Sequence, residues 1–298
     1  MASTRYNGLI LSILKGLARL PFPLLFLLSD LLSPLLQYVV RYRRKVVRRN
    51  LQNAFPEKSS TELRSIERKF YRHLCDISLE TAKAWRMTES VFRKRMTVKG
   101  DEALHQHFEE GRSVILLGMH LNNWEWSSIT QRYLKHQYLV VYNPVRGNPE
   151  FEAYLTNMRE RYGAVTIPVH KSARALMEFH QKNIPVCLVL GADQRPPTVN
   201  RFWTTFMNQE ACFNLGPEKI AQKSNIPVYL AYTKKTGRGR YQMEFIPLIA
   251  NPSEMTGDEI MITYIRAMEH FIRIEPEHYL WSHNRWSQKR PAEFPLVL

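Results

Sequence analysis

The sequence has few cysteines and lacks several common enzyme motifs. Its 298 residues include only three cysteines, Cys75, Cys187 and Cys212, and no pair has C-x-x-C spacing. This excludes a disulfide framework and a typical zinc site, so we expect reduced core thiols in a cytosolic compartment. A G-x-S-x-G elbow, a P-loop and a strand-linked G-x-G-x-x-G are also absent, which argues against the enzyme classes that use them. We therefore expect neither a metal nor a cofactor.

Acidic residues are scarce relative to basic ones. The chain has 27 Asp and Glu against 42 Lys and Arg, a net charge of +15. Such an excess indicates an anionic partner: nucleic acid, an acidic membrane surface or a phosphorylated substrate. Linkers, repeats and low-complexity tracts are lacking as well. Because 44% of the residues are hydrophobic, we expect one large packed domain with an appendage.

The exception to this moderate hydrophobicity is a long apolar run near the N-terminus. Residues 20–40 read LPFPLLFLLSDLLSPLLQYVV, 21 residues whose one charge is Asp30. As a helix this run would span about 31 Å, close to the thickness of a bilayer's hydrocarbon core. The basic stretch RYRRKVVRR follows at 41–49, where the positive-inside rule places the cytoplasmic boundary. We expect a membrane helix, with the rest of the chain on the cytoplasmic side.

Two other arrangements of this run remain open. Pro21, Pro23 and Pro34 interrupt the helical pattern, and Asp30 would be costly at the middle of a bilayer. A monotopic insertion into one leaflet is therefore the first alternative to a span, and a buried helix of a soluble domain is the second. In each case we divide the chain into a membrane-anchoring segment with a basic flank, residues 1–50, and an α/β catalytic domain, residues 51–298.

Beyond residue 60 the periodicity changes from helical to alternating helix and strand. A helix over 61–87 with Thr61 as its N-cap is expected first. Strands are predicted at 113–118, 138–142, 164–168, 185–190, 227–233 and 241–247, and helices at 124–134, 149–161, 172–182, 217–224 and 257–274. This order indicates an α/β fold, with a largely parallel central sheet flanked by helices. The glycines of KKTGRGR between the last two strands suit an antiparallel hairpin.

The stretch SVILLGMHLNNWEW, residues 113–126, carries the clearest chemical signal. An apolar strand ends at Gly118, and His120 and Glu125 follow where active sites of α/β sheets commonly lie. If Asn122 or Asn123 caps a helix, Glu125 in its first turn can fold back and fix the tautomer of His120. His120 would then act as a general base. The alternative is structural, because Asn122-x-x-Glu125 also resembles a capping box.

Four blocks of the chain resemble a known family. The H-x4-E at His120 and Glu125 resembles the H-x4-[D/E] motif of the lysophospholipid acyltransferase superfamily. More narrowly, the chain is similar to the late acyltransferases of lipid A biosynthesis. The other three blocks are VYNPVRGNPEFEAYLTNMRERYG with Arg159, VCLVLGADQRPP with Asp193, and YLWSHNRW with Trp281, His283, Arg285 and Trp286. The resemblance covers roughly residues 5 to 288, and the four blocks in order make it specific.

The resemblance implies a reaction and a location. An acyl chain would pass from the thioester of acyl carrier protein or coenzyme A to a hydroxyl of a lipid A precursor, a phosphorylated glycolipid, at the inner membrane. His120 would be the base, oriented by Glu125. Arg159 would bind a lipid phosphate or stabilise the oxyanion, since a guanidinium suits either. Asp193 would act in the site directly or shape it by binding a water, pairing with Arg195 or capping the following turn.

Two rival functions remain at this stage. The same base could acylate another lysolipid, an aminolipid or a glycolipid, because no motif fixes the acceptor. A non-catalytic basic protein that binds membranes or nucleic acid is the more distant alternative. Its support is the basic stretch at 41–49, but that stretch adjoins the apolar run and is typical of a topology signal. No nucleic-acid-binding motif occurs, so we expect no nucleic acid among the partners.

Overall fold

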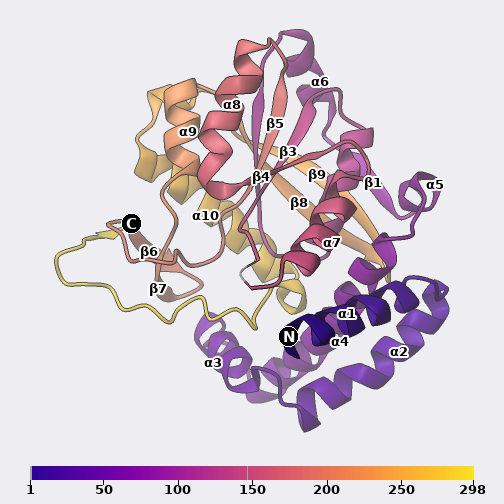
Figure 1. Ribbon diagram of the computed structural model, residues 1–298. Helices are drawn as coiled ribbons and strands as arrows, with labels where there is room; N and C mark the ends of the chain where they lie inside the picture. Colours follow the sequence, from indigo (N-terminus) through magenta and orange to yellow (C-terminus); the bar gives the residue numbers. More distant parts are fainter. Residues whose placement is uncertain (1, 146) are drawn as a thin grey trace.

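A seven-stranded sheet with helices on both faces forms the centre of the molecule (Figure 1). This computed structural model describes residues 2–145 and 147–298. Within the first helix it describes the surroundings of residues 8 and 11–17 only. The strand order is β1-β9-β8-β2-β5-β3-β4. The bounds are β1 Met96–Lys99, β2 Val114–Gly118, β3 Gln137–Tyr142, β4 Val165–Pro168, β5 Val186–Gly191, β8 Val228–Gly237 and β9 Arg240–Ile249.

Most neighbouring strands of this sheet run parallel. β2 pairs in parallel with both β5 and β8, and β3 pairs in parallel with β5 and β4. β9 returns antiparallel to β8, and β1 is parallel to β9. The largely parallel sheet flanked by helices is therefore confirmed, as is the hairpin around the glycines near residue 237. The six predicted strands all form, with bounds that differ by a few residues.

Alternate side chains of the strands enter two separate apolar cores. Ile115 and Leu117 of β2 point into one core, and Val114 and Leu116 point into the other. This follows from the pleat, which sends successive side chains to opposite faces. All four are almost completely buried. The continuous apolar run of β2 thus reflects a strand covered on both sides, as expected for a parallel sheet.

In the α/β part four predicted helices form, one predicted helix differs, and the short helices α5 and α6 were not predicted. The helices are α5 Glu89–Arg93, α6 Glu102–Glu109, α7 Pro149–Glu160, α8 Ser172–Gln181, α9 Pro217–Ser224 and α10 Gly257–Ile274. The segment expected as a helix over 124–134 is instead the 3-10 helix η2, Trp124–Arg132. Its backbone bonds from Trp126 to Asn123 and from Tyr133 to Thr130 close three-residue turns, which wind the chain more tightly than an α-helix.

A second, three-stranded sheet was not predicted. It has the order β10-β6-β7, with β6 Trp203–Phe206, β7 Gln209–Cys212 and β10 Leu296–Val297. The turn between β6 and β7 places Met207 and Asn208 at positive φ angles of 50° and 61°. A two-residue hairpin turn of this type suits the twist of the strands, and its usual sequence is Asn-Gly or Asp-Gly. The Met-Asn pair gives no such signal.

Four N-terminal helices lie together on one side of the α/β part (Figure 1). They are α1 Ala2–Leu17, α2 Phe22–Pro34 with its π-helical continuation η1 Leu35–Val39, α3 Arg44–Ala54 and α4 Ser60–Ala84. The N-cap of α4 is Ser59 rather than Thr61, because Ser59 and Glu62 form a complete capping box. α3 continues past residue 50, so one helix crosses the expected division between the anchoring segment and the catalytic domain.

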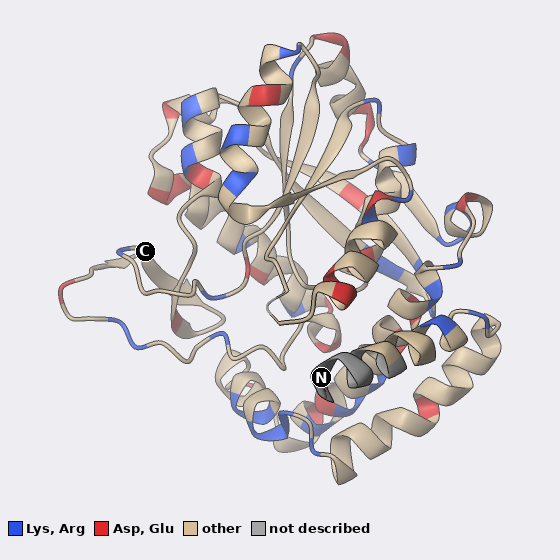
Figure 2. Ribbon diagram, viewed as in Figure 1, with Lys and Arg blue, Asp and Glu red and all other residues tan. Residues whose placement is uncertain are grey.

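The apolar helix of residues 22–39 is held along α4 on one side. It is long and apolar enough to cross a membrane, and 22% of it is buried in the protein. Ser29 donates a hydrogen bond of 2.6 Å to Asp76 of α4, and Asp30 pairs with Arg72 and Arg238. The opposite side is exposed and apolar, with Leu24, Leu27, Leu31, Leu35 and Val39. In Figure 2 this helix is almost free of charge, whereas α3 and the turn before it are basic.

Candidate active site

The register between β2 and β5 brings His120 and Asp193 together. Gly118 at the end of β2 lies opposite Gly191 at the end of β5, and the two strands are parallel. His120 and Asp193 each follow two residues later in the chain. Parallel neighbours end at the same edge of a sheet, so the two side chains meet although 73 residues separate them.

Asp193 holds His120 through both its ring and its backbone. Nδ1 of His120 lies 2.7 Å from Oδ1 of Asp193, and the backbone N–H of His120 donates to Oδ2 at 2.9 Å. Asp193 is almost fully buried, whereas 23% of the His120 side chain is exposed. The ring is therefore fixed by a buried carboxylate and remains reachable on its other side. This geometry suits the tautomer with the proton on Nδ1, in which Nε2 is unprotonated and can accept a hydrogen bond or a proton.

Electrostatics within this pair favour its charged form. Burial lowers the pKa of His120, but the charge and hydrogen bond of Asp193 more than offset this, and the pKa lies above its ordinary value. For Asp193, burial raises the pKa, and the contacts with His120 outweigh burial and lower it. The carboxylate thus stabilises the imidazolium that forms when Nε2 accepts a proton.

The expectation that Glu125 orients His120 is wrong, because Asp193 occupies that position. Glu125 instead forms a bidentate ion pair with Arg159. Nε and Nη2 of Arg159 donate to the two carboxylate oxygens over 2.8–3.1 Å. Both side chains are mostly buried, with 16% of Arg159 and 17% of Glu125 exposed. Glu125 still raises and Arg159 lowers the pKa of His120 through their charges, so both lie within its electrostatic reach.

Several residues around His120 were not singled out from the sequence. The side-chain amide nitrogen of Gln194 lies 3.1 Å from Nε2 of His120. The ring of Trp124 packs edge-on against the imidazole, with 4.9 Å between the ring centroids. Leu280 donates its backbone N–H to the carbonyl of His120 at 3.1 Å. The only sequence signal for Gln194 was its place directly after Asp193. The contact with Leu280 depends on the return of the chain 160 residues later, which no local pattern reveals.

The two asparagines between His120 and Glu125 bond this loop to carboxylates from distant parts of the chain. Asn122, at a φ of 57°, donates to Glu275, and Asn123 donates to Glu80 of α4, both at 2.8 Å. The side chain of Asn123 also caps η2 by accepting from the N–H of Trp126. The cap predicted at Asn122 or Asn123 is therefore confirmed at Asn123. Glu80 is fully buried, and burial raises its pKa to about 6.

The C-terminal block Trp281, His283, Arg285 and Trp286 packs into the protein behind Asp193. Trp281 and Arg285 are almost completely buried, and the guanidinium of Arg285 stacks 4.0 Å from the ring of Phe213. Burial lowers the pKa of His283 to about 4, which leaves its imidazole neutral at pH 7. Asp193 makes no ion pair with Arg195 among the described residues, so its interaction with His120 replaces that alternative.

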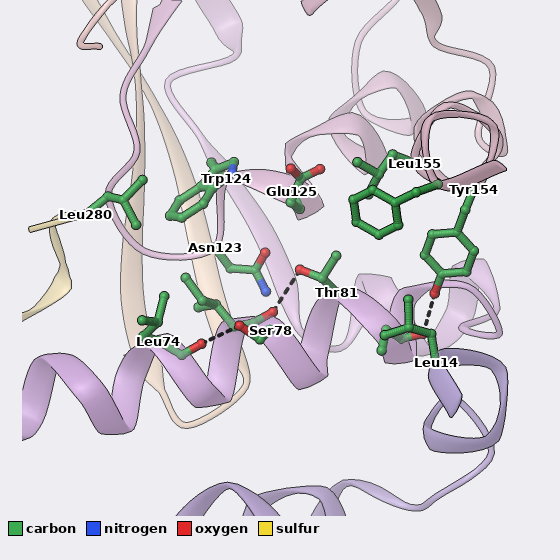
Figure 3. A pocket seen from close by; sticks show the side chains of 13 residues that line it. Leu14, Leu74, Ser78, Thr81, Asn123, Trp124, Glu125, Tyr154, Leu155 and Leu280 are labelled. Carbon is green, nitrogen blue, oxygen red and sulfur yellow. Dashed lines mark hydrogen bonds between the residues drawn. The ribbon is translucent and has the colours of Figure 1, made fainter. Parts of the chain in front are cut away.

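An apolar cavity opens beside the His120 loop. Its volume is about 390 Å³, within the range of sites that hold small molecules. Figure 3 shows Trp124 and Glu125 on one side of it, Leu74, Ser78 and Thr81 of α4 on another, and Tyr154 and Leu155 of α7 at its end. The cavity reaches the candidate base through Trp124, which lines the cavity and packs against the imidazole of His120. Within the described residues, no group of three or more His, Cys, Asp or Glu side chains is placed to hold a metal.

Comparisons with known proteins show the family of this chain. The chain matches the family described as bacterial lipid A biosynthesis acyltransferase over residues 2–288. It is 24% identical to the lipid A biosynthesis lauroyltransferase of Escherichia coli, over 96% of this chain and 92% of that protein. It is 22% identical to the palmitoleoyltransferase of the same organism, over 94% and 90%.

A solved structure is more distantly similar. The 1-acyl-sn-glycerophosphate acyltransferase of Thermotoga maritima aligns with a TM-score of 0.37 and 13% identity, over 89% of this chain and 97% of that one. The family match spans nearly the whole chain. The protein is therefore an acyltransferase that belongs to the bacterial lipid A biosynthesis acyltransferase family.

Proposed function

We propose that this protein transfers a fatty acyl chain from an acyl thioester to a hydroxyl of a lipid A precursor, with Nε2 of His120 as the general base. The observation that carries this proposal is the His120–Asp193 pair beside an apolar cavity. The relatives' names supply the acceptor. The donor is the thioester of acyl carrier protein or of coenzyme A.

The reaction needs no acyl-enzyme. Nε2 of His120 takes the proton of the acceptor hydroxyl as the hydroxyl oxygen attacks the thioester carbonyl. The hydroxyl would take the place of the Gln194 amide, which lies at hydrogen-bonding distance from Nε2. Asp193 stabilises the imidazolium formed in this step. When the tetrahedral intermediate collapses, the carbon–sulfur bond breaks and the imidazolium returns the proton to the leaving thiolate.

Arg159 and Glu125 act together in this proposal. Glu125 influences His120 by charge rather than by a hydrogen bond, since its oxygens accept from Arg159. The bonds to Glu125 use Nε and Nη2 of the guanidinium, which leaves Nη1 for a substrate oxygen. Arg159 then binds an acceptor phosphate or the oxyanion of the intermediate, where a preorganised donor is most valuable.

The protein would act at the cytoplasmic face of the inner membrane by monotopic insertion. Asp30 and Ser29 are bonded to α4 and to Arg238, so a full span would require these polar contacts to be lost inside the bilayer. The outward face of residues 24–40 is apolar, and basic residues of 41–49 follow it. This pairing suits a helix that lies in the interface of an anionic membrane.

The test is to delete the gene and complement it with wild type or with His120→Ala, then analyse lipids by mass spectrometry. We expect lipid A to lose one secondary acyl chain, and only wild type to restore it. In the purified enzyme, the loss of a general base should reduce kcat by about 10²–10⁴-fold. His180→Ala is the matched control, since His180 is exposed on α8.

Near-wild-type activity of His120→Ala would refute the assignment of the base. Unchanged lipid A together with loss of an acyl chain from another lipid class would refute the acceptor and keep the chemistry. Assays with purified acyl carrier protein thioester and with the coenzyme A thioester identify the donor directly.

A further inference from the structure

A second apolar cavity lies against α4, and it shares a residue with the cavity beside His120. We call the cavity next to Trp124 and Glu125 the inner cavity, and this one the outer cavity. The outer cavity has a volume of about 300 Å³ and is lined by Leu32, Leu35, Leu36, Val40, Cys75, Ser78 and Leu79. Ser78 also lines the inner cavity. The two cavities therefore meet at one exposed position of α4.

Most residues that line the two cavities are apolar, and the polar exceptions Asn123 and Glu125 of the inner cavity are each bonded to another side chain. Ser78 donates its hydroxyl hydrogen bond to the carbonyl of Leu74, and Thr81 donates to Ile77, each at 2.7 Å. Both hydroxyls are satisfied within their own helix. A chain that passes over Ser78 would meet methylene and methyl groups, so a hydrocarbon would lose no hydrogen bond in replacing water there. Ser78 and Thr81 are visible with these bonds in Figure 3.

The far ends of the two cavities differ in what they reach. The inner cavity is lined on one side by Trp124, which packs against His120. The outer cavity is bounded by Leu35 and Val40, which are 46% and 62% exposed on the face that we propose inserts into the membrane. Arg41, Arg43 and Lys45, all exposed, follow Val40 directly. Phosphate groups of a bilayer lipid would be attracted to these cations while its acyl chains contact the leucines.

We propose that an acyl chain of the membrane-held acceptor lipid reaches the catalytic site along α4, through the outer cavity, over Ser78 and into the inner cavity. This inference rests on the proposed function and adds a path to it. The occupant is the acceptor because it resides in the bilayer that the outer cavity faces, whereas a carrier-bound thioester arrives from water. Ser78 is the residue that lines both cavities, and its side chain is small and exposed. No bulky side chain therefore closes the path at this position.

The test replaces Ser78 by tryptophan, which fills the junction and leaves His120, Asp193, Glu125 and Arg159 unsubstituted. Initial rates are measured with a lipid A precursor in anionic phospholipid vesicles and with a water-soluble derivative whose hydroxyacyl chains are shortened but keep the reacting hydroxyl. We expect Ser78→Trp to lower kcat/KM for the vesicle-held precursor about tenfold or more, the scale of an overpacked site. The rate with the short-chain derivative and the KM of the thioester donor should stay within about twofold.

Three controls make the result decisive. Ser60→Trp places the same side chain at the exposed start of α4, outside both cavities, and should behave as wild type. Ser78→Ala keeps the path open and should also behave as wild type. Circular dichroism melting curves exclude a folding defect.

Equal kcat/KM of Ser78→Trp and wild type on vesicle-held acceptor would overturn the path, as would a selective rise in the donor's KM. His120→Ala is assayed in parallel, because activity in that variant would refute the proposed base and not the path.

Discussion

At the scale of single residues, the catalysis that we propose depends on how one imidazole is held. His120 has a buried carboxylate on Nδ1, an amide near Nε2 and an indole against its ring. Each contact leaves Nε2 as the nitrogen that faces an incoming hydroxyl. Asp193 makes the contact that sets both the tautomer and the pKa of the ring.

Replacing Asp193 by asparagine should therefore change both rate and pH dependence. The base is active when neutral, and a raised pKa means that half of His120 becomes neutral only above about pH 6.5. Without the carboxylate, the pKa of His120 falls, so the acidic limb of kcat/KM should move to lower pH. Loss of orientation should also reduce the plateau rate by about 10²-fold or more.

The measurement is kcat/KM from pH 5 to 9 for wild type and Asp193→Asn, with thermal melts to compare stability. An acidic limb that stays in place or moves upward would show that Asp193 does not raise the pKa of the catalytic group. Asp258→Asn serves as the control, since Asp258 forms an exposed ion pair with Arg201.

At the scale of secondary-structure elements, the site depends on how η2 and α7 are joined. The Glu125–Arg159 pair connects the first turn of η2 to the last turn of α7. Next to it, Asn123 bonds η2 to Glu80 of α4. Most residues that line the inner cavity belong to these three elements, so the polar contacts also influence its shape.

A double-mutant cycle separates the two roles of Arg159. If the guanidinium acts only by holding Glu125, Arg159→Lys should lose activity in the native background but not in a Glu125→Gln background. If Arg159 also contacts the substrate, as we propose, Arg159→Lys should cost about tenfold in kcat/KM in both backgrounds, because lysine cannot reproduce the fork of donors.

The cycle requires purified single and double variants assayed with the same donor and acceptor. Arg201→Lys, in the exposed pair with Asp258, is the control and should leave kcat/KM unchanged. Full activity of Arg159→Lys in the native background would remove Arg159 from the site altogether.

At the scale of the whole molecule, one side carries the apolar and basic surface that we propose inserts into a membrane. The apolar helix α2–η1 exposes leucines on its outer face, while Ser29 and Asp30 bond to Asp76 and Arg238 of the protein. The basic turn and α3 follow it in the chain (Figure 2). The net charge of +15 adds long-range attraction to anionic lipids. The catalytic edge of the sheet lies near this side, because α4 contacts both α2 and the loop after His120.

Substituting the outward leucines should release the protein from vesicles. Leu27, Leu31 and Leu35 are 58%, 65% and 46% exposed, and burial of each partly exposed side chain in lipid is worth about 1 kcal/mol. The triple serine variant should bind anionic vesicles roughly hundredfold more weakly in sedimentation assays. A serine triple variant of Val169, Met177 and Ile184, exposed on the α/β part, should bind like wild type. Equal binding of the leucine variant would refute this membrane face.

The sequence by itself determined most elements of the α/β fold and indicated the candidate site residues. The apolar run of β2, the alternation of helices and strands, and the capping signals are local, so six strands and most helices follow from neighbouring residues. His120, Arg159 and Asp193 could be named because each belongs to a block that resembles the family. The chemistry of a base without a protein nucleophile also follows from residue types.

Only the tertiary structure decided which of these residues meet. The partner of His120 depends on the parallel register of β2 and β5, a contact across 73 residues that spacing along the chain cannot encode. Glu125, five residues away, was the nearer choice in sequence and pairs with Arg159 instead. The cavities beside α4 and the packing of the apolar helix on it likewise arise from elements distant in the chain. Local signals specify elements, whereas a site depends on the packing of those elements in three dimensions.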